Sequence, residues 1–515
     1  FFFRYERQRD ELMKEIVTCR QMKALDLHTI EEKKMPSCVL MERAALAVAA
    51  EMERFLTKKD RVLVVCGSGN NGGDGAALAR ILTLHGFDTT IFLVEKNHAY
   101  SAELSRQLEI AGAYGVLRVN NPDWSEYTTI VDAIFGVGLS RPVEGFFAEV
   151  IGHINASSAK KVAVDIPSGI HGDSGQVLGT AVSADLTVTF AWRKQGLCFY
   201  PGRSYAGRIV VADIGIYGAE NRNGIARHLE PEDLCLLPGR RPDGNKGTFG
   251  KVLLVAGSPG MCGAAYLSAE ASLRAGAGMV QVQTAQENRM PLQILLPEAM
   301  VSCTFTEEEN QRLLDWCDVI LIGPGLGMSE ESKSRAQWFL MHGSKSSKPI
   351  VLDADGLNLL AAHPEWKAYL NDRTILTPHM REMSRLTKKS IEEIKKHPVS
   401  TALSCAAETN AVCVLKDACT VTADGAGALY LNLYGNAGMA SAGSGDVLSG
   451  ILAGIFCRYL SAKEETDTAK KAALGVLLHA LAGDFAAEKL GEQAMTARDI
   501  IRALPDVDGK RRERS

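Results

Sequence analysis

The sequence predicts an α/β protein of two domains, and three observations support this. The chain has 515 residues, which is long for a single hydrophobic core. Apolar runs of strand length alternate with Ala- and Leu-rich segments, as in a parallel sheet covered by helices. A strand, a glycine-rich loop and a helix follow one another from residue 61 and again from residue 251. We therefore expect an N-terminal Rossmann-like, doubly wound domain in residues 1–220 and a second α/β domain in residues 221–515.

Composition and charge argue against several classes of protein. Hydrophobic residues make up 46% of the chain and charged residues 23%, as in an ordinary globular protein. The formal net charge of −4 gives no basic field, so nucleic acid is not an expected partner. No apolar run reaches the roughly 18 residues of a membrane span, and residues 1–6 lack the apolar core of an ordinary signal peptide. We expect no membrane partner.

Cysteine usage predicts the compartment. The 12 cysteines include no CxxC pair, and Cys66, Cys413 and Cys457 lie in apolar runs. This pattern favours buried free thiols over a disulfide framework or a zinc site. We expect a cytoplasmic protein.

The first half of the chain alternates between strands and helices. Residues from about 10 to 50 are predicted to be helical because they are rich in Ala and Leu and contain few helix breakers. Expected helices also include 101–111 and 145–154. Strands are expected at 61–66, 90–94, 116–119, 129–135, 161–165 and 186–190.

Polar residues gather after these strands. Segment 67–75 has five glycines in nine residues, and a helix is expected from Ala76, so the segment predicts a phosphate or nucleotide cradle. Asp132 and Asp165 lie towards the ends of two other strands. An oxygen-rich cluster without His or Cys suits a hard cation, although a single Asp at a strand end is usually a turn former.

The second half repeats the alternation beyond a polar, glycine-rich linker at 217–224. Strands are expected to begin near residues 251, 319, 349, 374 and 412, and helices are expected at 264–277 and 471–489. His379 and Lys416 follow two of these strands. His379 is expected to contact a ligand rather than to be a structural histidine, and Lys416 to lie beside a phosphate rather than at the surface.

Segment 436–446 is expected to organise this second half. It contains three Gly and two Ser, and it places Asp446 in the first turn of an apolar helix. The free N–H groups of a helix N-terminus attract anions, so a carboxylate at this position favours a base beside a transferred phosphate. The alternative is that Asp446 only caps the helix.

The first half resembles the N-terminal domain of the bacterial bifunctional NAD(P)H-hydrate repair enzymes, through segment 67–75 and Asp165-Ile-Pro-Ser-Gly169. In that family this domain is an epimerase, which interconverts the R and S forms of hydrated NADH or NADPH. The resemblance implies that Asp165 is the acid/base, and that Asn71, Asp132 and Ser168 coordinate K⁺. It also implies that the hydrated dinucleotide is held by Asn70, Asn71, Gly72, Gly73, Asp74, Gly136, Val137, Gly138, Leu139, Ser140, Arg141 and Pro142.

The second half resembles the ribokinase-like fold, and within it the ADP-dependent NAD(P)H-hydrate dehydratases. The matching motifs, in order, are 246–250, 323–327, 353–358, 377–379, 416–420 and 443–446. The resemblance implies that Ala265, Gly325, His379 and Asp446 contact the hydrated dinucleotide. It implies that the adenine nucleotide is bound by Lys416, Asp417, Ala418, Cys419, Thr420 and Gly445. Met380 and Arg381 stand where the family has a Pro-Gly pair.

Together these resemblances imply a cofactor-repair enzyme. Asp446 would deprotonate the ring hydroxyl of the S hydrate, which would attack the terminal phosphoryl group of ADP or ATP, with Mg²⁺ accompanying the nucleotide. The partners would be small molecules, and a homo-oligomer is expected. Two alternatives are a ribokinase-like kinase of a vitamin precursor and a dinucleotide-sensing module without turnover. The sequence does not decide ADP against ATP, NADH against NADPH, the oligomer, or transfer of substrate between domains.

Overall fold

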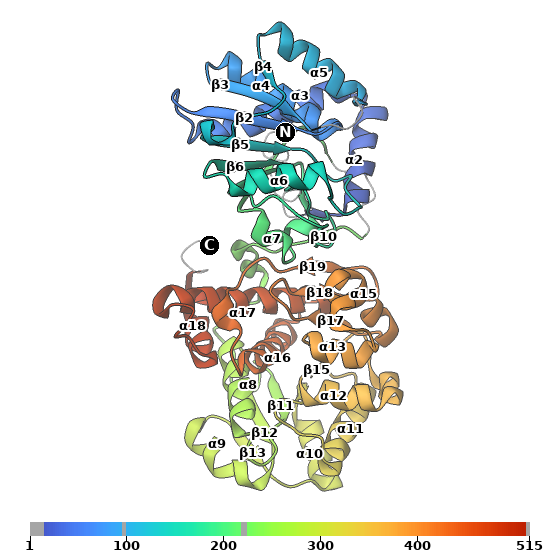
Figure 1. Cartoon of the computed structure of the whole chain (residues 1–515). Coiled ribbons are helices and arrows are strands. Elements are labelled where there is room, and N and C mark those ends of the chain that lie inside the picture. The colour runs from blue at the N-terminus through green and yellow to red at the C-terminus, as the bar shows by residue number, and fades with distance from the viewer. Residues whose placement is uncertain (1–14, 95–98, 218–223, 511–515) are drawn as a thin grey trace. The chain divides into compact units, whose positions relative to one another are not determined.

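The computed structural model describes residues 15–94, 99–217 and 224–510, and it divides into two compact units, Phe1–Ala226 and Arg227–Ser515. The expected domain boundary at 220/221 falls within residues 218–223, outside the described residues. Both units are α/β, and each is built around a mostly parallel sheet (Figure 1), so the predicted fold class is confirmed.

Unit 1 contains a parallel sheet in which every neighbouring pair of strands runs in the same direction. In spatial order its strands are β4 (Leu117–Val119), β3 (Asp88–Leu93), β2 (Arg61–Cys66), β5 (Thr129–Ala133), β6 (Lys160–Val164), β7 (Leu186–Phe190) and β9 (Arg208–Ala212). Its helices are α2 (Cys19–Glu31), α3 (Ser37–Glu53), α4 (Asn70–Leu84), α5 (Ala102–Ala113), α6 (Phe146–Ala156) and α7 (Gly202–Tyr205), with short 3₁₀ turns η1 (Trp124–Glu126) and η2 (Gln195–Leu197).

Strand β2 shows why this sheet is buried on both faces. Val62 and Val64 belong to the core beneath α3, α4 and α5, whereas Leu63 and Val65 belong to the core beneath α6. Successive strand residues point to opposite faces, so a continuous apolar run fills two cores at once. The expected strands of unit 1 are therefore present with small changes at their ends.

Two details of unit 1 differ from the prediction. A short strand, β1 (Glu15–Val17), lies in the segment expected to be helical, and it pairs in parallel with β8 (Arg193–Lys194). Helix α4 begins at Asn70 rather than at Ala76, so most of the predicted glycine loop forms the first turns of a helix. Three-residue strands carry too little periodicity to be distinguished from a helix end by sequence pattern.

Unit 2 has a parallel sheet that ends in an antiparallel part. In spatial order its strands are β13 (Met300–Ser302), β12 (Met279–Gln283), β11 (Lys251–Val255), β14 (Val319–Ile322), β15 (Ile350–Leu352), β16 (Thr374–Leu376), β17 (Val412–Leu415), β18 (Val421–Ala423) and β19 (Leu429–Leu431). The β17–β18 and β18–β19 pairs are antiparallel. Arg227 of β10 (Ala226–Arg227) pairs with Tyr430 of β19.

Helices cover both faces of this sheet (Figure 1). They are α8 (Cys262–Ala275), α9 (Arg289–Leu295), α10 (Glu307–Trp316), α11 (Glu330–Lys345), α12 (Asp355–Ala362), α13 (Met380–Thr387), α14 (Ile391–Lys396), α15 (Pro398–Thr409), α16 (Ser444–Ala462), α17 (Thr468–Leu490) and α18 (Ala497–Lys510). The 3₁₀ turns are η3 (Pro231–Leu236), η4 (Gln286–Asn288), η5 (Pro364–Tyr369) and η6 (Ala437–Met439).

Helices α8 and α16 pack without a gap because α16 has glycines at the contact. A Cβ on Gly450 would lie 2.3 Å from the carbonyl oxygen of Ser268, and a Cβ on Gly454 would lie 2.7 Å from that of Ser272. The Ser272 hydroxyl also donates to the Gly450 carbonyl at 3.1 Å. Because glycine has no Cβ, the helices approach closely, and this contact fixes the N-terminus of α16.

All 12 cysteines are free thiols, and seven of them are buried. Among the described residues, no helix is both long enough and apolar enough to cross a membrane.

Candidate active sites

The polar residues predicted in unit 1 lie at the carboxyl edge of its sheet, where the strand order reverses. The chain runs from β2 outward to β3 and β4, then returns to place β5 on the other side of β2. The N–H of Gly67 donates to the carbonyl of Ala133 at 3.0 Å, so the segments after β2 and β5 adjoin each other. In open α/β sheets this crevice is the usual ligand site.

The glycine-rich segment brings the start of α4 against this crevice. A Cβ on Gly72 would lie 1.9 Å from the carbonyl oxygen of Gly67, so the turn needs glycine there. The N-cap of α4 is Gly69, and no side chain caps the helix. The first-turn N–H groups, including those of Asn70 and Asn71, are therefore suited to bind an anion.

Asp165 follows β6 in a left-handed backbone conformation with φ of +68°, which is uncommon for a residue other than glycine. Its Oδ1 accepts three hydrogen bonds: from Lys194 Nζ at 2.5 Å, Thr189 Oγ1 at 3.1 Å and the Phe190 N–H at 3.3 Å. Its Oδ2 accepts none from the described residues. The carboxylate is thus held by one oxygen, and the other is free to exchange a proton with a ligand.

Lys194 contacts Asp165, and the sequence analysis did not identify it. It is 1% exposed, and β8 places it opposite Val17 of β1. Besides Asp165, its ammonium donates to Thr189 Oγ1 at 3.1 Å and to the Phe190 carbonyl at 2.8 Å. All three ammonium hydrogens are therefore used within the protein. In the sequence, Lys194 is a lysine shortly after an apolar strand. Lysines at the protein surface often occupy the same kind of position.

Two further carboxyl groups lie near this ion pair. Burial raises the pKa of Asp74 well above its ordinary range, the nearby Asp165 and Asp26 raise it further, and Lys194 opposes the shift. Burial also raises the pKa of Asp26 on α2, again opposed by Lys194. Lys194 is therefore a single buried cation close to three carboxyl groups, those of Asp165, Asp74 and Asp26.

The predicted cation ligands are brought together at the ends of β5 and β6. Asp132 is 1% exposed, and its carboxylate accepts the Ser168 hydroxyl at 2.6 Å and the Ser168 N–H at 2.7 Å. Burial raises the pKa of Asp132 to about 6, although its hydrogen bonds oppose the shift. The Asn71 side chain lies beside Gly136, and its buried Nδ2 has no hydrogen-bond partner among the described residues.

Segment 136–142 continues from β5 at the same edge. It forms a turn in which the Leu139 N–H donates to the Gly136 carbonyl at 3.3 Å, and Arg141 and Pro142 are exposed. Val143 then enters the core. The segment is an exposed loop beside Asn71, which is the position expected of it.

In unit 2, Asp446 lies in the first turn of α16, as predicted. It does not cap the helix: the N-cap is Gly443, with φ of +91°, and no side chain makes a capping hydrogen bond. The main-chain carbonyl of Asp446 accepts hydrogen bonds from Ser268 and Ser449, both at 3.0 Å, which fixes the residue. The alternative of a purely capping aspartate is therefore not supported.

The electrostatic environment of Asp446 brings the pKa of its carboxyl group close to neutral pH. Burial raises its pKa to about 7, Asp353 and Asp355 raise it as well, and Lys416 opposes the shift. The carboxylate accepts no hydrogen bond from the described residues. It is thus poised to take a proton from a ligand hydroxyl.

Lys416, at the end of β17, faces Asp446 across this edge of the sheet. Its ammonium donates to Asp353 Oδ1 at 2.8 Å, and Thr377 Oγ1 donates to the same oxygen at 2.7 Å. A Cβ on Gly445 would lie 3.2 Å from the ammonium, which places the cation against the first turn of α16. Burial acts to lower the pKa of Lys416, but Asp353 and Glu382 outweigh it and the pKa is raised.

His379 caps α13, and its half-exposed imidazole faces outward. Its Nδ1 accepts the N–H groups of Arg381 at 3.0 Å and Glu382 at 3.3 Å, so the proton of the neutral ring resides on Nε2. Burial and Lys416 lower the pKa of His379. The Pro-Gly pair absent from this sequence is replaced by Met380 and Arg381 in a regular helical turn, and the cap is kept.

Glu382 completes this cap, since its carboxylate accepts the His379 N–H at 2.8 Å. Burial raises its pKa to about 7, an effect that Lys416 opposes. The proximity of Glu382 to Lys416 arises from the pairing of His379 with Lys416 at the ends of β16 and β17.

The loops after β11 and β14 carry the other predicted contacts. The carbonyl of Gly325 accepts the Ser258 N–H at 2.6 Å and its hydroxyl at 3.0 Å. Ala265 is fully buried against Gly257, so its side chain lies behind this surface, and its predicted contact remains a prediction.

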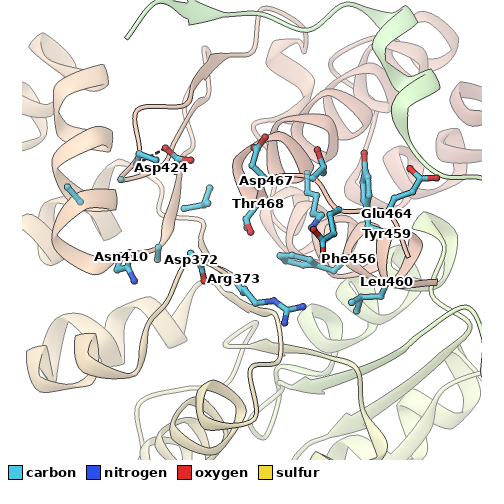
Figure 2. Close-up of a pocket in the computed structure, with 18 of the residues that line it drawn as sticks. Asp372, Arg373, Asn410, Asp424, Phe456, Tyr459, Leu460, Glu464, Asp467 and Thr468 are labelled. Atoms are coloured by element: carbon cyan, nitrogen blue, oxygen red, sulfur yellow. Dashed lines mark hydrogen bonds between the residues drawn. The ribbon is translucent and has the colours of Figure 1, made fainter. Parts of the chain in front are cut away.

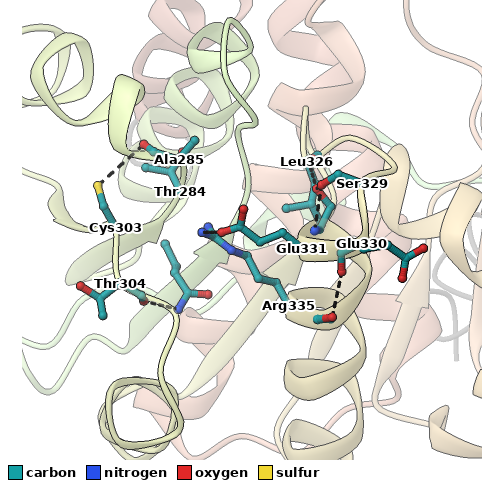
Figure 3. A network of polar contacts seen from close by, with 12 residues as sticks. Thr284, Ala285, Cys303, Thr304, Leu326, Ser329, Glu330, Glu331 and Arg335 are labelled. Carbon is teal, nitrogen blue, oxygen red and sulfur yellow. Dashed lines mark hydrogen bonds and ion pairs between the residues drawn. The ribbon is translucent and has the colours of Figure 1, made fainter.

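A polar network holds these loops in place (Figure 3). Ser332 donates to the Leu326 carbonyl at 2.7 Å, and Ser329 caps α11 by accepting the Ser332 N–H at 3.1 Å. Nearby, Arg335 pairs with Glu331 and lies over the Phe305 ring. Side chains at the start of α11 therefore help to fix the turn that contains Gly325.

The predicted nucleotide segment is the turn between β17 and β18. Asp417 and Ala418 are exposed, Cys419 is buried, and the Thr420 carbonyl accepts the Asn432 N–H at 2.9 Å. The turn starts at Lys416 and therefore adjoins Gly445. The structure thus groups Lys416 with the start of α16.

His479 of α17 was overlooked because the surrounding helix is rich in Ala and Leu. It is buried, and its Nε2 lies 3.4 Å from the Ser444 hydroxyl behind the start of α16. Burial lowers its pKa to about 4, so it is neutral. His479 therefore supports the loop that leads into α16 through its contact with Ser444.

A further cavity of unit 2 lies away from this edge (Figure 2). It has a volume of about 1150 Å³, and it is lined by residues such as Asp372, Arg373 and Asn410, which precede β16 and β17. It therefore lies at the opposite edge of the sheet from Asp446. Among the described residues, no cluster of three or more His, Cys, Asp or Glu side chains could hold a metal ion.

Comparison with known protein families matches both units. A family model described as "YjeF-related protein N-terminus" matches residues 37–196, and one described as "NAD(P)H-hydrate dehydratase" matches residues 252–506. The bifunctional NAD(P)H-hydrate repair enzyme of Thermofilum pendens is 38% identical over 504 residues, which cover 94% of this chain and 94% of that protein.

Two other proteins extend this picture. The bifunctional NAD(P)H-hydrate repair enzyme of Escherichia coli is 36% identical over 88% of this chain and 87% of its own length. The structure of an ADP/ATP-dependent NAD(P)H-hydrate dehydratase from Bacillus subtilis, co-crystallised with ATP and Mg²⁺, covers 57% of this chain and 99% of its own, with 29% identity and a TM-score of 0.46.

Proposed function

The chain belongs to the bifunctional NAD(P)H-hydrate repair enzymes, and from that premise we propose that Asp165 is the acid/base of its epimerase and Asp446 the base of its dehydratase. As a member of this family, the chain is an enzyme of metabolite repair. It interconverts the R and S epimers of hydrated NADH or NADPH, and it dehydrates the S epimer with ADP or ATP. We assign the first activity to residues 1–220 and the second to residues 221–515.

The epimerase step rests on the free oxygen of Asp165. Epimerisation at the hydroxyl-bearing ring carbon requires that the ring open, or the hydroxyl leave, and then reform. Asp165 Oδ1 is occupied by Lys194, Thr189 and the Phe190 N–H, so Oδ2 is the atom that moves the proton. The uncapped start of α4, with Asn70, Asn71 and Gly72, would bind the pyrophosphate of the dinucleotide. Loop 136–142 would cover it.

The residues present fit a potassium ion. The buried Asp132 carboxylate lies against the Ser168 hydroxyl, and the orphaned amide nitrogen of Asn71 would be replaced by an oxygen if the amide were turned over. Asn71, Asp132 and Ser168 would hold the ion, and its charge would offset that of the buried Asp132 carboxylate.

The dehydratase step begins at Asp446. Its carboxylate takes the proton of the ring hydroxyl, the hydroxyl oxygen bonds to the terminal phosphorus of the nucleotide, and the bond from that phosphorus to the leaving AMP (or ADP) breaks. The carbon–oxygen bond then breaks, phosphate leaves, and loss of the neighbouring ring proton restores the double bond. Phosphate is a far better leaving group than hydroxide, which explains why a kinase-like site performs a dehydration.

The other predicted residues surround this step. Lys416, the turn 417–420 and Gly445 would bind the phosphate chain, and Mg²⁺ would arrive with the nucleotide. His379 would donate its Nε2 hydrogen to the hydrated dinucleotide, with Gly325 beside the ring. The N–H groups at the start of α16 would stabilise charge on the phosphoryl group.

The observation that carries the proposal is the half-buried carboxylate of Asp446, which accepts no hydrogen bond from the described residues and lies beside Lys416 at an uncapped helix N-terminus, with a pKa raised to about 7 by burial. A carboxylate that serves only structure would be hydrogen-bonded. The location that we propose is the cytoplasm, and we propose that the chain forms a homo-oligomer.

The test is recovery of NADH absorbance from a mixture of R and S hydrated NADH, with Mg²⁺, K⁺ and either ADP or ATP. Full nucleotide-dependent recovery from both epimers is expected of the whole chain. Asp165→Asn should limit recovery to the S fraction at early times, and Asp446→Asn should abolish recovery. If epimers interconvert at an unchanged rate in Asp165→Asn, Asp165 is not the catalyst.

The competing function is a vitamin-precursor kinase that uses the same second unit. It predicts a stable phosphorylated product, whereas the dehydratase releases phosphate together with NADH. Measurement of released phosphate against recovered NADH therefore separates the two, and a ratio near one supports the dehydratase. A dinucleotide-sensing module predicts no turnover at all.

A further inference from the structure

The dehydratase site contains a buried carboxylate that the proposed mechanism does not use. Asp353, directly after β15, is 1% exposed. Its Oδ1 accepts the Lys416 ammonium at 2.8 Å and the Thr377 hydroxyl at 2.7 Å. Each partner comes from a different strand end, so Asp353 joins β15, β16 and β17 at the edge that carries the site.

Lys416 has three carboxylates as neighbours and one hydrogen-bonded partner. Its charge interacts with Asp353, Glu382 and Asp446, yet its ammonium bonds only to Asp353 among the described residues. Lysine is a point charge on a flexible stem, so its position depends on which carboxylate holds it. Two of its three donors remain for a ligand.

We propose that Asp353 is a positioning residue of the dehydratase: it holds the Lys416 ammonium beside Gly445, facing the phosphoryl group, and keeps it from pairing with Asp446. This inference rests on the roles proposed for Lys416 and Asp446. An ammonium bonded to Asp446 would stabilise the ionised carboxylate and weaken it as a base. An ammonium held by Asp353 leaves the base free and offers two hydrogens to the phosphate oxygens.

The Thr377 hydroxyl fixes the orientation of the Asp353 carboxylate. This hydroxyl occupies Asp353 Oδ1 from the β16 side, and the Thr377 side chain is fully buried, so the carboxylate cannot rotate freely. The charged or titratable groups around Asp446 and Lys416 are Asp353, Asp355, Glu382, His379 and His479. Of these, Asp353 alone is directly bonded to the ammonium in the described part of the chain.

The experiment compares Asp353→Asn with Lys416→Met in the full-length enzyme, using S-hydrated NADH and ADP–Mg²⁺. The readouts are kcat, the KM for ADP, and the pH dependence of kcat/KM. Asp353→Asn should lower kcat by about 10- to 100-fold, as expected of a misplaced group near the reacting atoms. It should also move the acid limb to lower pH, because Asp446 loses a negative neighbour and gains the ammonium.

Lys416→Met should move the same limb in the opposite direction. Removal of the cation leaves Asp446 with only negative neighbours, so its acid limb should move to higher pH, and the KM for ADP should rise. Thr377→Val keeps the Asp353 charge but removes one bond to it, so its loss of kcat should be less than about tenfold. Thr377→Val tests the proposal independently if Asp353→Asn does not fold.

Asp424→Asn is the matched control, because Asp424 accepts two main-chain hydrogen bonds at the opposite edge of the same sheet. It should leave kcat and the acid limb unchanged. A loss of kcat in Asp353→Asn with an unmoved acid limb would mean a merely structural role and would overturn the inference. Full activity in Asp446→Asn would instead overturn the proposed function on which it rests.

Discussion

The two units each place an aspartate at the carboxyl edge of a parallel sheet, but they prepare it in opposite ways. Asp165 is held by three hydrogen bonds to one oxygen, one of which comes from a buried lysine 2.5 Å away. The carboxylate of Asp446 accepts no hydrogen bond from the described residues, and burial raises its pKa to about 7. The Asp165 carboxylate is oriented by its hydrogen-bond partners, whereas the Asp446 carboxylate lacks such partners in the described part of the chain and has a raised pKa.

The supports behind the two residues also differ. Asp165 depends on a local turn and on Lys194, which a short strand presents. Asp446 depends on the packing of a whole helix, α16, against α8. The comparison teaches that a site can be fixed either by a few polar bonds or by many apolar contacts. Substitutions should therefore affect the two kinds of site differently.

The largest effect is expected at the aspartate without hydrogen bonds. Asp446→Asn removes the base but keeps the shape, so nucleotide-dependent recovery of NADH should fall by about 10²- to 10⁴-fold. Epimer interconversion by unit 1 in the same preparation is the internal control and should be unchanged. Retention of recovery within threefold of the wild type would contradict the role of Asp446.

The buried ion pair of unit 1 should fail through stability as well as activity. Lys194→Met keeps the stem but leaves Asp165 unpaired, which should lower the free energy of unfolding of unit 1 by about 3–5 kcal/mol. Hydrogen exchange resolved by peptide should show faster exchange in β6, β7 and β8 and unchanged exchange in unit 2. Lys23→Met, at an exposed position of α2, is the control. Unchanged exchange near Asp165 would mean that the pair contributes no stability.

The site in unit 2 should instead be sensitive to packing. Gly450→Ala adds a Cβ 2.3 Å from the Ser268 carbonyl, so it should destabilise unit 2 by about 1–3 kcal/mol and displace Asp446. Thermal unfolding together with dehydratase activity measures both effects. Gly152→Ala, in a helix of unit 1 with open space at the Cβ position, should instead be neutral or slightly stabilising. Equal effects of the two substitutions would mean that the helix contact is not tight.

Features that depend on local sequence patterns could be predicted from the sequence. The strands could be predicted because continuous apolar runs fill both faces of each sheet, as the alternation of Val62, Leu63 and Val64 shows. Asp446 could be placed because its helix carries a strong apolar pattern. These features are encoded locally, over ten or more residues.

The remaining features depend on contacts between distant segments. The contact of Lys194 with Asp165, 29 residues away, becomes visible only in the fold, where Lys194 lies on β8 beside β1. The pairing of Asp353 with Lys416 spans 63 residues. The early start of α4 at Asn70 was missed because glycines are poor helix formers, and here the close approach of Gly72 to Gly67 outweighs that preference.

A pH measurement sharpens the difference between the two aspartates. A base must be ionised, so dehydratase kcat/KM should be constant well above pH 7 and fall about tenfold for each pH unit below it, following the Asp446 pKa of about 7. The profile should be measured with S-hydrated NADH alone, so that epimerisation does not enter. A limb near pH 4 would show that Asp446 is not made basic by burial.

The smallest effect is expected from one hydrogen bond to Asp165. Thr189 is fully buried on β7, and its hydroxyl donates to Asp165 Oδ1 and accepts from Lys194. Thr189→Val should therefore slow epimerisation several-fold, because one hydrogen bond contributes about 1 kcal/mol. Thr187, two residues earlier on the same strand, is equally buried but donates to the Ala206 carbonyl. Thr187→Val should therefore cost similar stability without slowing epimerisation. If both substitutions slow epimerisation equally, the Thr189 bond acts through the fold of β7 rather than through Asp165, and unit 1 would then rely on packing as unit 2 does.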